Sequence, residues 1–419
     1  MHRRTGSADL PLHGGRVPPW LSARMAALGR VIVEAIVHEY GRDELLRRLA
    51  HPFWFQSFGA VMGMDWHSSG ITTSVIGALK RGLAPVQREL GIFVCGGKGA
   101  QSRKTPDELV AAADSTGFDA APLVRASRLV AKIDGAAVQD GFDLYLHAFF
   151  ATVEGRWCVV QQGMNENLRE ARRYHWQSEN LPGFFESPHA AIEGRNMGSI
   201  LNLADARAAR NRAAGLELAR GGPHLTLDVL RRYGASDAAL SLPLFPEIET
   251  VPEPPLPHLR LPHRHEVRAS DVVLRRLHGT LAAAADAHLT DFADLLLTPG
   301  VGARTVEALA FVAEVVHGAP ARFSDPARFS LALGGKDGHP FPVPIKVFDE
   351  TIKLLKRAVS RAKLGSSEAL AAIKRLDTQA RVLESCGGQP LFPGPAFESF
   401  VTAERARSAT LGGRTVASR

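Results

Sequence analysis

The chain has few cysteines and no long apolar run, and both absences restrict what kind of protein it is. Only three cysteines occur among 419 residues, far apart, at positions 95, 158 and 386. They argue against a disulfide framework and against a zinc site of clustered thiolates, and they favour a reducing compartment. No apolar run reaches the roughly 18 residues that a membrane span needs, and the opening MHRRTGSADLPLHGG has no apolar signal region. We therefore expect a cytoplasmic protein with no membrane partner.

A loop that binds a nucleotide triphosphate is also missing. The stretch GGKG at 96–99 follows a short apolar strand candidate, as phosphate-binding loops do. It lacks the Walker spacing and the Lys-Ser/Thr pair, so we expect no nucleotide triphosphate as a partner. Two interpretations remain open for the nearby Lys98, Arg103 and Lys104: a patch that contacts phosphates, or a solvated loop.

The composition is that of an ordinary soluble protein with a basic C-terminal part. Hydrophobic residues make up 45% of the chain and charged residues 22%, and the length suffices for two or three domains. The net charge of +7 permits a polyanionic partner. From 351 to 419 there are 12 Lys and Arg against 5 Asp and Glu, a surplus equal to that of the whole chain.

The distribution of strand and helix patterns predicts an α+β protein. We expect a mixed α/β domain with a small antiparallel sheet at 1–240, a proline-rich linker at 241–265, an all-helical domain at 266–380, and a basic tail at 381–419. Helical spacing of apolar residues predicts further helices at 21–40, 42–49 and 73–82.

The clearest strand signal is a hairpin at 143–162. Two apolar segments, 143–153 and 156–162, flank Glu154-Gly155, which is typical of a two-residue turn. That turn would place His147 directly opposite Gln162 on one face of the sheet. The other face would carry the apolar side chains Leu144, Leu146 and Phe150.

The stretch DFADLLLTPGVGARTVEALAFVAEVV at 291–316 has the pattern of a helix-hairpin-helix. The first helix would end at Leu297, and the second would begin near Ala303. Two glycines in the turn leave backbone N–H groups uncovered at the positive end of a helix, which is a favourable place for a phosphate. The expected DNA-binding residues here are Gly300, Val301, Gly302, Arg304 and Thr305. A Pro-Gly turn that merely connects two helices is the structural alternative.

A basic stripe follows on the predicted helix 349–364. Lys353, Arg357 and Arg361 recur at intervals of four, so they share one side of that helix. The stripe could lie along a phosphate backbone, and an ordinary solvated helix face explains the spacing equally well.

Several of these segments together resemble a widespread prokaryotic family known as domain of unknown function 763. The resemblance is carried by ADLPLHGGRVPPWL, PFWFQSFG, DWHSSG, GGKGAQSRKTP, AKIDGAAVQDGFDLYLHAFF, GRWCVVQQGMN, ARRYHW, LLTPGVGARTVEALA and GGKDGHPFPVP, over about 5–376. It implies no assigned activity. An uncharacterised N-terminal domain beside a DNA-gripping hairpin suggests DNA processing or repair.

Our leading hypothesis for the chemistry is a metal-dependent nuclease. Phosphodiester cleavage needs hard oxygen or imidazole ligands for Mg²⁺ or Mn²⁺, and the segment 132–147 is rich in such groups. The expected catalytic residues are Asp134, Asp140, His147, Gln162 and His67, and the expected metal ligands are Asp140, His147 and Asp65. As alternatives, Asp-Gly pairs at 134–135 and 140–141 are turns, His147 is a hydrogen-bonded core residue, and Ser68 or Ser69 caps a helix.

Two other classes of protein stay open. One is a DNA-binding protein without catalysis. The other is a monofunctional DNA glycosylase, because Asp325 follows Gly302 by 23 positions, close to the spacing of glycosylases that share the hairpin. Ser324-Asp325-Pro326 is also typical of a helix N-cap. RRYHW at 172–176 could stack on bases or pack into a core, and the sequence leaves a homo-oligomer open.

Overall fold

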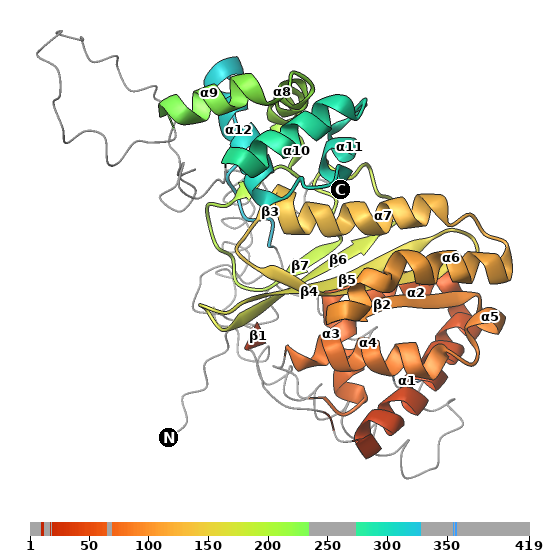
Figure 1. Cartoon of the computed structure of the whole chain (residues 1–419). Coiled ribbons are helices and arrows are strands. Elements are labelled where there is room, and N and C mark those ends of the chain that lie inside the picture. The colour runs from red at the N-terminus through yellow and green to blue at the C-terminus, as the bar shows by residue number, and fades with distance from the viewer. Residues whose placement is uncertain are drawn as a thin grey trace, which may run out of the picture.

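An antiparallel sheet forms the centre of the molecule (Figure 1). The computed structural model describes residues 10–11, 17, 19–64, 69–233, 274–327, 355 and 357 of the 419. The strands run in the order β1-β6-β5-β4-β2, and β7 pairs with β6. Their bounds are β1 Leu10–Pro11, β2 Ile92–Lys98, β4 Asp143–Thr152, β5 Trp157–Asn165, β6 Glu170–Gln177 and β7 Ala191–Glu193.

The hairpin between β4 and β5 has a three-residue loop, so the predicted two-residue turn is wrong. Thr152 N donates to Arg156 O at 2.9 Å, and Gly155 has a φ of +78°. A left-handed residue at the third loop position is the usual way to close such a loop, and glycine adopts it without strain. The register therefore shifts by one residue. His147 lies opposite Gln161, and Gln162 lies opposite Leu146.

Helices from the N-terminal part cover one face of the sheet, which we call the lower face (Figure 1). They are α1 Pro19–Tyr40, α2 Arg42–Leu49, α3 Pro52–Val61, α4 Gly70–Leu83 and the short α5 Gln87–Leu90. The first two agree with the predicted ranges. The third helix, α3, follows directly, with His51 as its N-cap and Pro52 in its first turn.

Two further helices, α6 Thr105–Thr116 and α7 Ala121–Lys132, cover the opposite face, which we call the upper face (Figure 1). The 3₁₀ turn η1 (Gly99–Lys104) leads into α6, and one turn of π-helix, η2 (Ile133–Ala137), follows α7. A π turn widens the backbone and often occurs at functional sites. A second small sheet, β3 (Val138–Gln139) with β8 (Leu201–Asn202), lies next along the chain.

A helical layer packs above α7 (Figure 1). It contains α8 Ala209–Arg220, α9 Pro223–Tyr233, α10 Leu274–Asp286, α11 Phe292–Leu297 and α12 Ala303–His317, with the 3₁₀ turn η3 (Ala206–Ala208) before α8. The buried Asn211 on α8 donates to the carbonyls of Ala310 and Ala319 at 2.9 and 2.8 Å, which ties α8 to α12. The layer thus combines helices from both sides of the expected linker, and the linker itself lies outside the described residues.

The expected fold class, a small antiparallel sheet in the N-terminal half with helices following, is confirmed. One hydrophobic cluster runs from the upper face of the sheet into the helical layer. A second fills the space between the lower face and α1–α4. None of the helices in the described part of the chain is both long and apolar enough to span a membrane.

Candidate functional site

Three of the predicted catalytic residues, Asp134, Asp140 and His147, lie on the upper face of the sheet or at its edge, beneath α7 and the helical layer. His147 projects upward from β4, Asp134 lies in the π turn η2, and Asp140 precedes β4. Each is at most 6% exposed. A catalytic group in this place would therefore be sealed from solvent in the described structure.

A relay of hydrogen bonds joins Ser127, His147, Gln161 and Asp134. Ser127 Oγ lies 2.9 Å from His147 Nε2, and Gln161 Oε1 lies 2.7 Å from His147 Nδ1. The amide nitrogen of Gln161 donates to Asp134 Oδ2 and, at 3.2 Å, to Val130 O. The relay therefore starts on α7, crosses β4 and β5, and ends in η2.

These contacts determine the tautomer of His147. Because the amide nitrogen of Gln161 donates to a carboxylate and a carbonyl, its oxygen faces the ring and accepts the proton of Nδ1. Nε2 is then the unprotonated nitrogen and accepts the hydroxyl proton of Ser127. Burial lowers the pKa of His147, although Gln161 and Asp134 oppose the shift. The imidazole is thus neutral near pH 7, with its basic nitrogen turned to a buried hydroxyl.

Asp134 is held by further donors on the same face. The indole Nε1 of Trp176 donates to Oδ2 at 2.8 Å, and His189 Nε2 lies 2.5 Å from Oδ1. The rings of Trp176 and His189 are themselves only 4.3 Å apart. Both carboxylate oxygens of Asp134 are therefore occupied.

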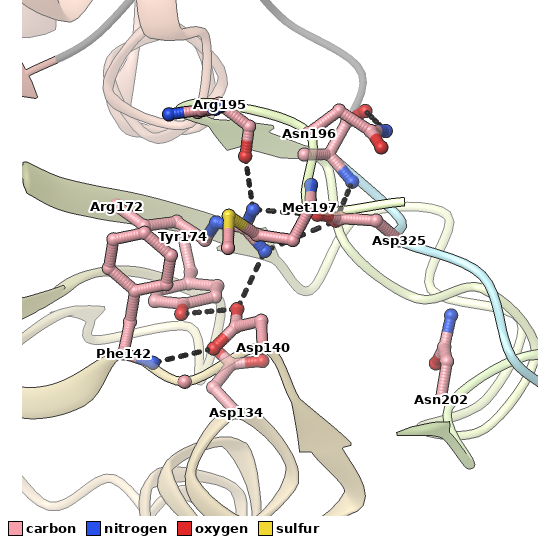
Figure 2. Close-up of polar contacts among 12 residues, drawn as sticks. Asp134, Asp140, Phe142, Arg172, Tyr174, Arg195, Asn196, Met197, Asn202 and Asp325 are labelled. Atoms are coloured by element: carbon pink, nitrogen blue, oxygen red, sulfur yellow. Dashed lines mark hydrogen bonds and ion pairs between the residues drawn. The ribbon is translucent and has the colours of Figure 1, made fainter. Parts of the chain in front are cut away.

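Asp140 belongs to a second buried group, which Figure 2 shows. Its Oδ2 accepts from Arg172 Nη1 at 2.8 Å and from the hydroxyl of Tyr174 at 2.6 Å. Its Oδ1 accepts from Phe142 N at 3.1 Å across the turn at Gly141, where φ is +80°. Burial raises the pKa of Asp140, while Arg172 opposes the shift. The Asp-Gly turn that the sequence left as an alternative is present, and the carboxylate closes it.

Arg172 also binds Asp325, which the sequence suggested as a glycosylase residue. Its Nη2 is 2.7 Å from Asp325 Oδ2, and both side chains are 0% exposed. Burial favours a lower pKa for the Arg172 guanidinium, but the carboxylates of Asp325 and Asp140 raise it above the ordinary value. Asp325 additionally accepts from Met197 N (Figure 2) and from Ala327 N. Its carboxylate is fully engaged inside the protein.

Gln162 lies on the lower face, away from His147. It is hydrogen-bonded to Thr72 and Tyr145, and its amide nitrogen donates to Ser69 O at 3.1 Å. The predicted pair of His147 and Gln162 is thus wrong, because the one-residue shift in register moves Gln162 through the sheet. Ser69 belongs to the DWHSSG segment, whose Asp65 and His67 lie outside the described residues.

Arg173 organises the rest of this lower polar group. It pairs with Glu193, donates to Gln56 at 2.9 Å and to Thr72 at 3.2 Å, and gives its Nε proton to His175 Nε2 at 3.0 Å. Burial lowers the pKa of Arg173, while Glu193 opposes the shift. All of RRYHW is buried in β6, so these side chains pack and pair inside the core and are not free to stack on bases.

Asp140 and His147, the two expected ligands of Mg²⁺ or Mn²⁺ that the structure describes, do not fit a metal ion as they stand. In the described ranges no three or more His, Cys, Asp or Glu side chains gather in a way that suits a metal. Asp140 faces the cation Arg172 and accepts the Tyr174 proton, while both ring nitrogens of His147 have partners. A divalent cation would have to displace these donors.

The 298–305 turn is only partly exposed. Gly300, with φ +87°, Gly302 and Arg304 reach the surface, whereas Val301 and Thr305 are 1% and 6% exposed. Arg304 forms a 3.1 Å ion pair with Glu307, with its side chain 62% exposed. Gly302, the N-cap residue of α12, makes no side-chain capping hydrogen bond. The Thr305 hydroxyl is therefore a poor candidate for a phosphate contact, and the exposed groups are glycine backbone and one arginine.

Leu355, on the helix predicted to carry the basic stripe, does not share a hydrophobic cluster with the 298–305 turn. Leu355 is buried in the cluster beneath the lower face, whereas Val301 is buried in the cluster of the upper face. Arg357, two residues after Leu355, is exposed and helical. Lys353 and Arg361 lie outside the described residues.

Sequence reasoning missed Ser127 and Gln161, and it did not foresee the partners of Arg172 and Lys132. Gln161 had a usable signal, because a glycine at the third loop position also permits the register in which Gln161 faces His147. The partners of Ser127, Arg172 and Lys132 come from segments remote in the sequence. No spacing of residues along the chain predicts these contacts.

Comparison with known proteins leads to a family and to no activity. A search of curated proteins and a search of solved structures each found no match. The family model described as "protein of unknown function (DUF763)" matches residues 6–343, which is most of the chain. The protein belongs to this DUF763 family.

Proposed function

We propose that this protein binds the phosphate backbone of DNA through the 298–305 turn, acting as a helix-hairpin-helix. The observation that carries the proposal is the uncapped N-terminus of α12 behind two glycines. The first N–H groups of a helix have no acceptor within the helix, and Gly302, the N-cap residue here, has no side chain that could accept from them. Together with the positive end of the helix dipole, they form a site for an anionic oxygen.

The fold supports this role by holding the carbonyl side of the turn. Lys132 Nζ donates to Val301 O, and the Gln139 amide donates to Ala303 O at 2.8 Å. Lys132 is the last residue of α7 and Gln139 lies in β3, so both donors come from outside the helical layer that contains the turn. The turn is thereby fixed through its carbonyl oxygens. Val301 N donates to Thr298 O at 3.1 Å, so the N–H groups proposed for a ligand are those of Gly300, Gly302 and the first turn of α12.

The chemistry of the turn favours contact with phosphates over recognition of bases. The exposed groups are backbone N–H donors and the guanidinium of Arg304, which stays exposed despite its pair with Glu307. Such donors fix a protein on DNA without reading sequence, and their binding weakens as salt rises. We therefore expect similar affinity for duplexes of unrelated sequence.

The sharpest test is Gly302→Asp. An aspartate at the N-cap would accept the free N–H groups itself and would repel phosphate, and it should stabilise α12. Fluorescence anisotropy with two unrelated duplexes at 50 and 200 mM salt should show at least a tenfold loss of affinity for both. Thermal unfolding of the same sample verifies that the variant is folded.

Arg88→Asp is the charge control, because Arg88 is an exposed arginine on α5. This substitution makes the protein more negative than Gly302→Asp does, yet it should leave the DNA affinity within about twofold of that of the wild type. Unchanged binding by Gly302→Asp, or an equal loss in both variants, would overturn the proposal.

The nuclease and glycosylase hypotheses have less support than DNA binding. The residues named for them, Asp140, His147 and Asp325, are committed to buried partners. Incubating the wild-type protein with plasmid DNA and Mn²⁺, and with damaged duplex, tests both activities. Cleavage that is lost in Asp140→Asn and His147→Gln, with folding intact, would restore the nuclease.

A further inference from the structure

A cavity of about 670 Å³ lies beside the proposed DNA-binding turn. Its walls come from the end of α6, the 117–120 loop and the first half of α7, and Leu297 of α11 closes one side. The left-handed Gly117, with φ +85°, ends α6 and turns the loop over the cavity. The volume lies within the range of pockets that hold small organic ligands.

The lining combines an apolar wall with a polar rim, as a nucleobase requires. Phe118, Val124 and Leu297 supply apolar surface, and the Phe118 ring is braced 5.9 Å from the ring of Phe93. A base has two apolar faces that stack on such groups. The cavity can therefore accept a flat ring.

The polar groups at the rim match the edge and the phosphate of a nucleotide. Asp114 and Arg128 are both exposed, and neither makes a hydrogen bond or ion pair with another residue in the described ranges. A carboxylate can accept from an exocyclic amino group of a base. The unpaired guanidinium can meet the adjoining phosphate.

The cavity lies next to the 298–305 turn. Leu297 lines it, and the turn follows directly at 298–302. Five residues span at most about 18 Å, which is about five nucleotide steps along one strand of B-DNA. Arg125, also in the lining, holds α11 in place through a 2.9 Å pair with Asp294.

We propose that this cavity receives an unpaired base of the DNA strand held at the turn. In an intact duplex the bases are stacked and paired, so they cannot enter. The inference rests on the proposed function and sharpens it: the preferred ligand is DNA with a single-stranded end, gap or bulged nucleotide.

Two variants test the pocket without removing packed side chains. Ala121→Trp fills the cavity from an exposed position in its lining, and Arg128→Gln removes the unpaired cation. Anisotropy should be measured with a blunt duplex, a single strand, and a duplex carrying one bulged 2-aminopurine, whose fluorescence also reports its environment. Wild type should bind the bulged duplex about tenfold more tightly than the blunt duplex. Each variant should lose this preference and keep its affinity for the blunt duplex.

Arg88→Gln serves as control, because Arg88 is an exposed arginine on α5. It should keep the preference for the bulge. If wild type binds both duplexes equally, or if the pocket variants keep the preference, the pocket inference fails while the turn still binds DNA. If the pocket variants lose affinity only for free deoxynucleoside monophosphates, and not for the bulged duplex, the cavity is a mononucleotide site and the inference is likewise overturned. Gly302→Asp leaves the pocket intact. If this variant loses all DNA binding, the turn is required for binding whether or not the pocket inference holds, so the two proposals are tested separately.

Discussion

Arg172 on β6 and Asp325, 153 residues later in the chain, form an ion pair in which both side chains are fully buried. The pair fastens the segment after α12 to the edge of the sheet, next to the backbone bonds Ser324 N to Ile200 O and Asp325 N to Gly198 O. Asp140 holds the other side of the same guanidinium (Figure 2). The helical layer is thus joined to the sheet domain by charge as well as by apolar packing.

Removing one carboxylate from this group should be costly. Asp325→Ala leaves Arg172 buried with Asp140 as its only carboxylate partner, and we expect a loss of about 3–5 kcal/mol in the free energy of unfolding. Urea denaturation followed by circular dichroism measures it. Asp228→Ala is the control, since the Asp228–Arg231 pair is 56% and 60% exposed and should contribute less than about 1 kcal/mol. Equal midpoints for the two variants would contradict the structural role.

The His147 tautomer can be observed directly. Nitrogen-15 NMR should show a proton on Nδ1 and none on Nε2, and this pattern should persist below pH 6.5 because burial lowers the pKa of His147. Ser127→Ala should keep the tautomer, since Gln161 sets it. Gln161→Leu should release it. A doubly protonated ring in the wild type at pH 6 would rule out the relay as described.

Stability should fall in mild acid through His51. This residue caps α3 by accepting from Trp54 N at 3.4 Å, and burial, with a smaller effect of Arg48, lowers its pKa to about 4. The unfolded chain, with a pKa near 6.5, binds the extra proton, so stability is lost as pH falls from about 6.5 towards 4. We expect His51 to account for about 2 kcal/mol of loss by pH 5.

His51→Asn isolates this effect, because asparagine caps a helix without titrating. Urea midpoints at pH 7 and pH 5 should drop less in the variant than in the wild type. An identical pH dependence in both proteins would show that His51 is not the group responsible.

Two glycine substitutions should change stability in opposite directions. Gly155 has φ +78° in the β4–β5 loop. Gly155→Ala should therefore lower the free energy of unfolding by about 1–2 kcal/mol, although an added Cβ would meet no atom within 4 Å. Gly279 lies inside α10, also in open space, and Gly279→Ala should stabilise by about 0.5–1 kcal/mol. Thermal unfolding of both variants checks the signs. A stabilising Gly155→Ala would mean that the loop does not need the left-handed conformation.

Local patterns predicted much of the fold. The spacing of apolar residues placed α1, α2 and α12 close to their observed bounds, because a helix that buries one face must repeat its apolar residues with the helical period. The alternation around 143–162 placed β4 and β5 for the same reason with period two. The surplus of basic residues in 351–419, by contrast, does not predict which part of the fold this segment contacts. Leu355, which lies in the segment, packs beneath the lower face of the sheet.

The candidate site was predicted less well, and the reason is geometric. Asp134, Asp140 and His147, the predicted catalytic residues, are all buried on one side of the sheet. Their partners were not predictable, since Ser127, Arg172 and His189 arrive from a helix, another strand and a loop. One residue of register decided whether His147 faced Gln161 or Gln162.

The sequence by itself determined the fold class, the hairpin and the two helices around the 298–305 turn, because helix and strand periods and turn residues act over a few positions. Only the tertiary structure decided which polar groups meet. Burial leaves each of them in need of a partner, and the partner is whichever group the packing of remote elements brings within 3 Å. That is why Asp325 binds Arg172 inside the protein, 153 residues along the chain from its partner.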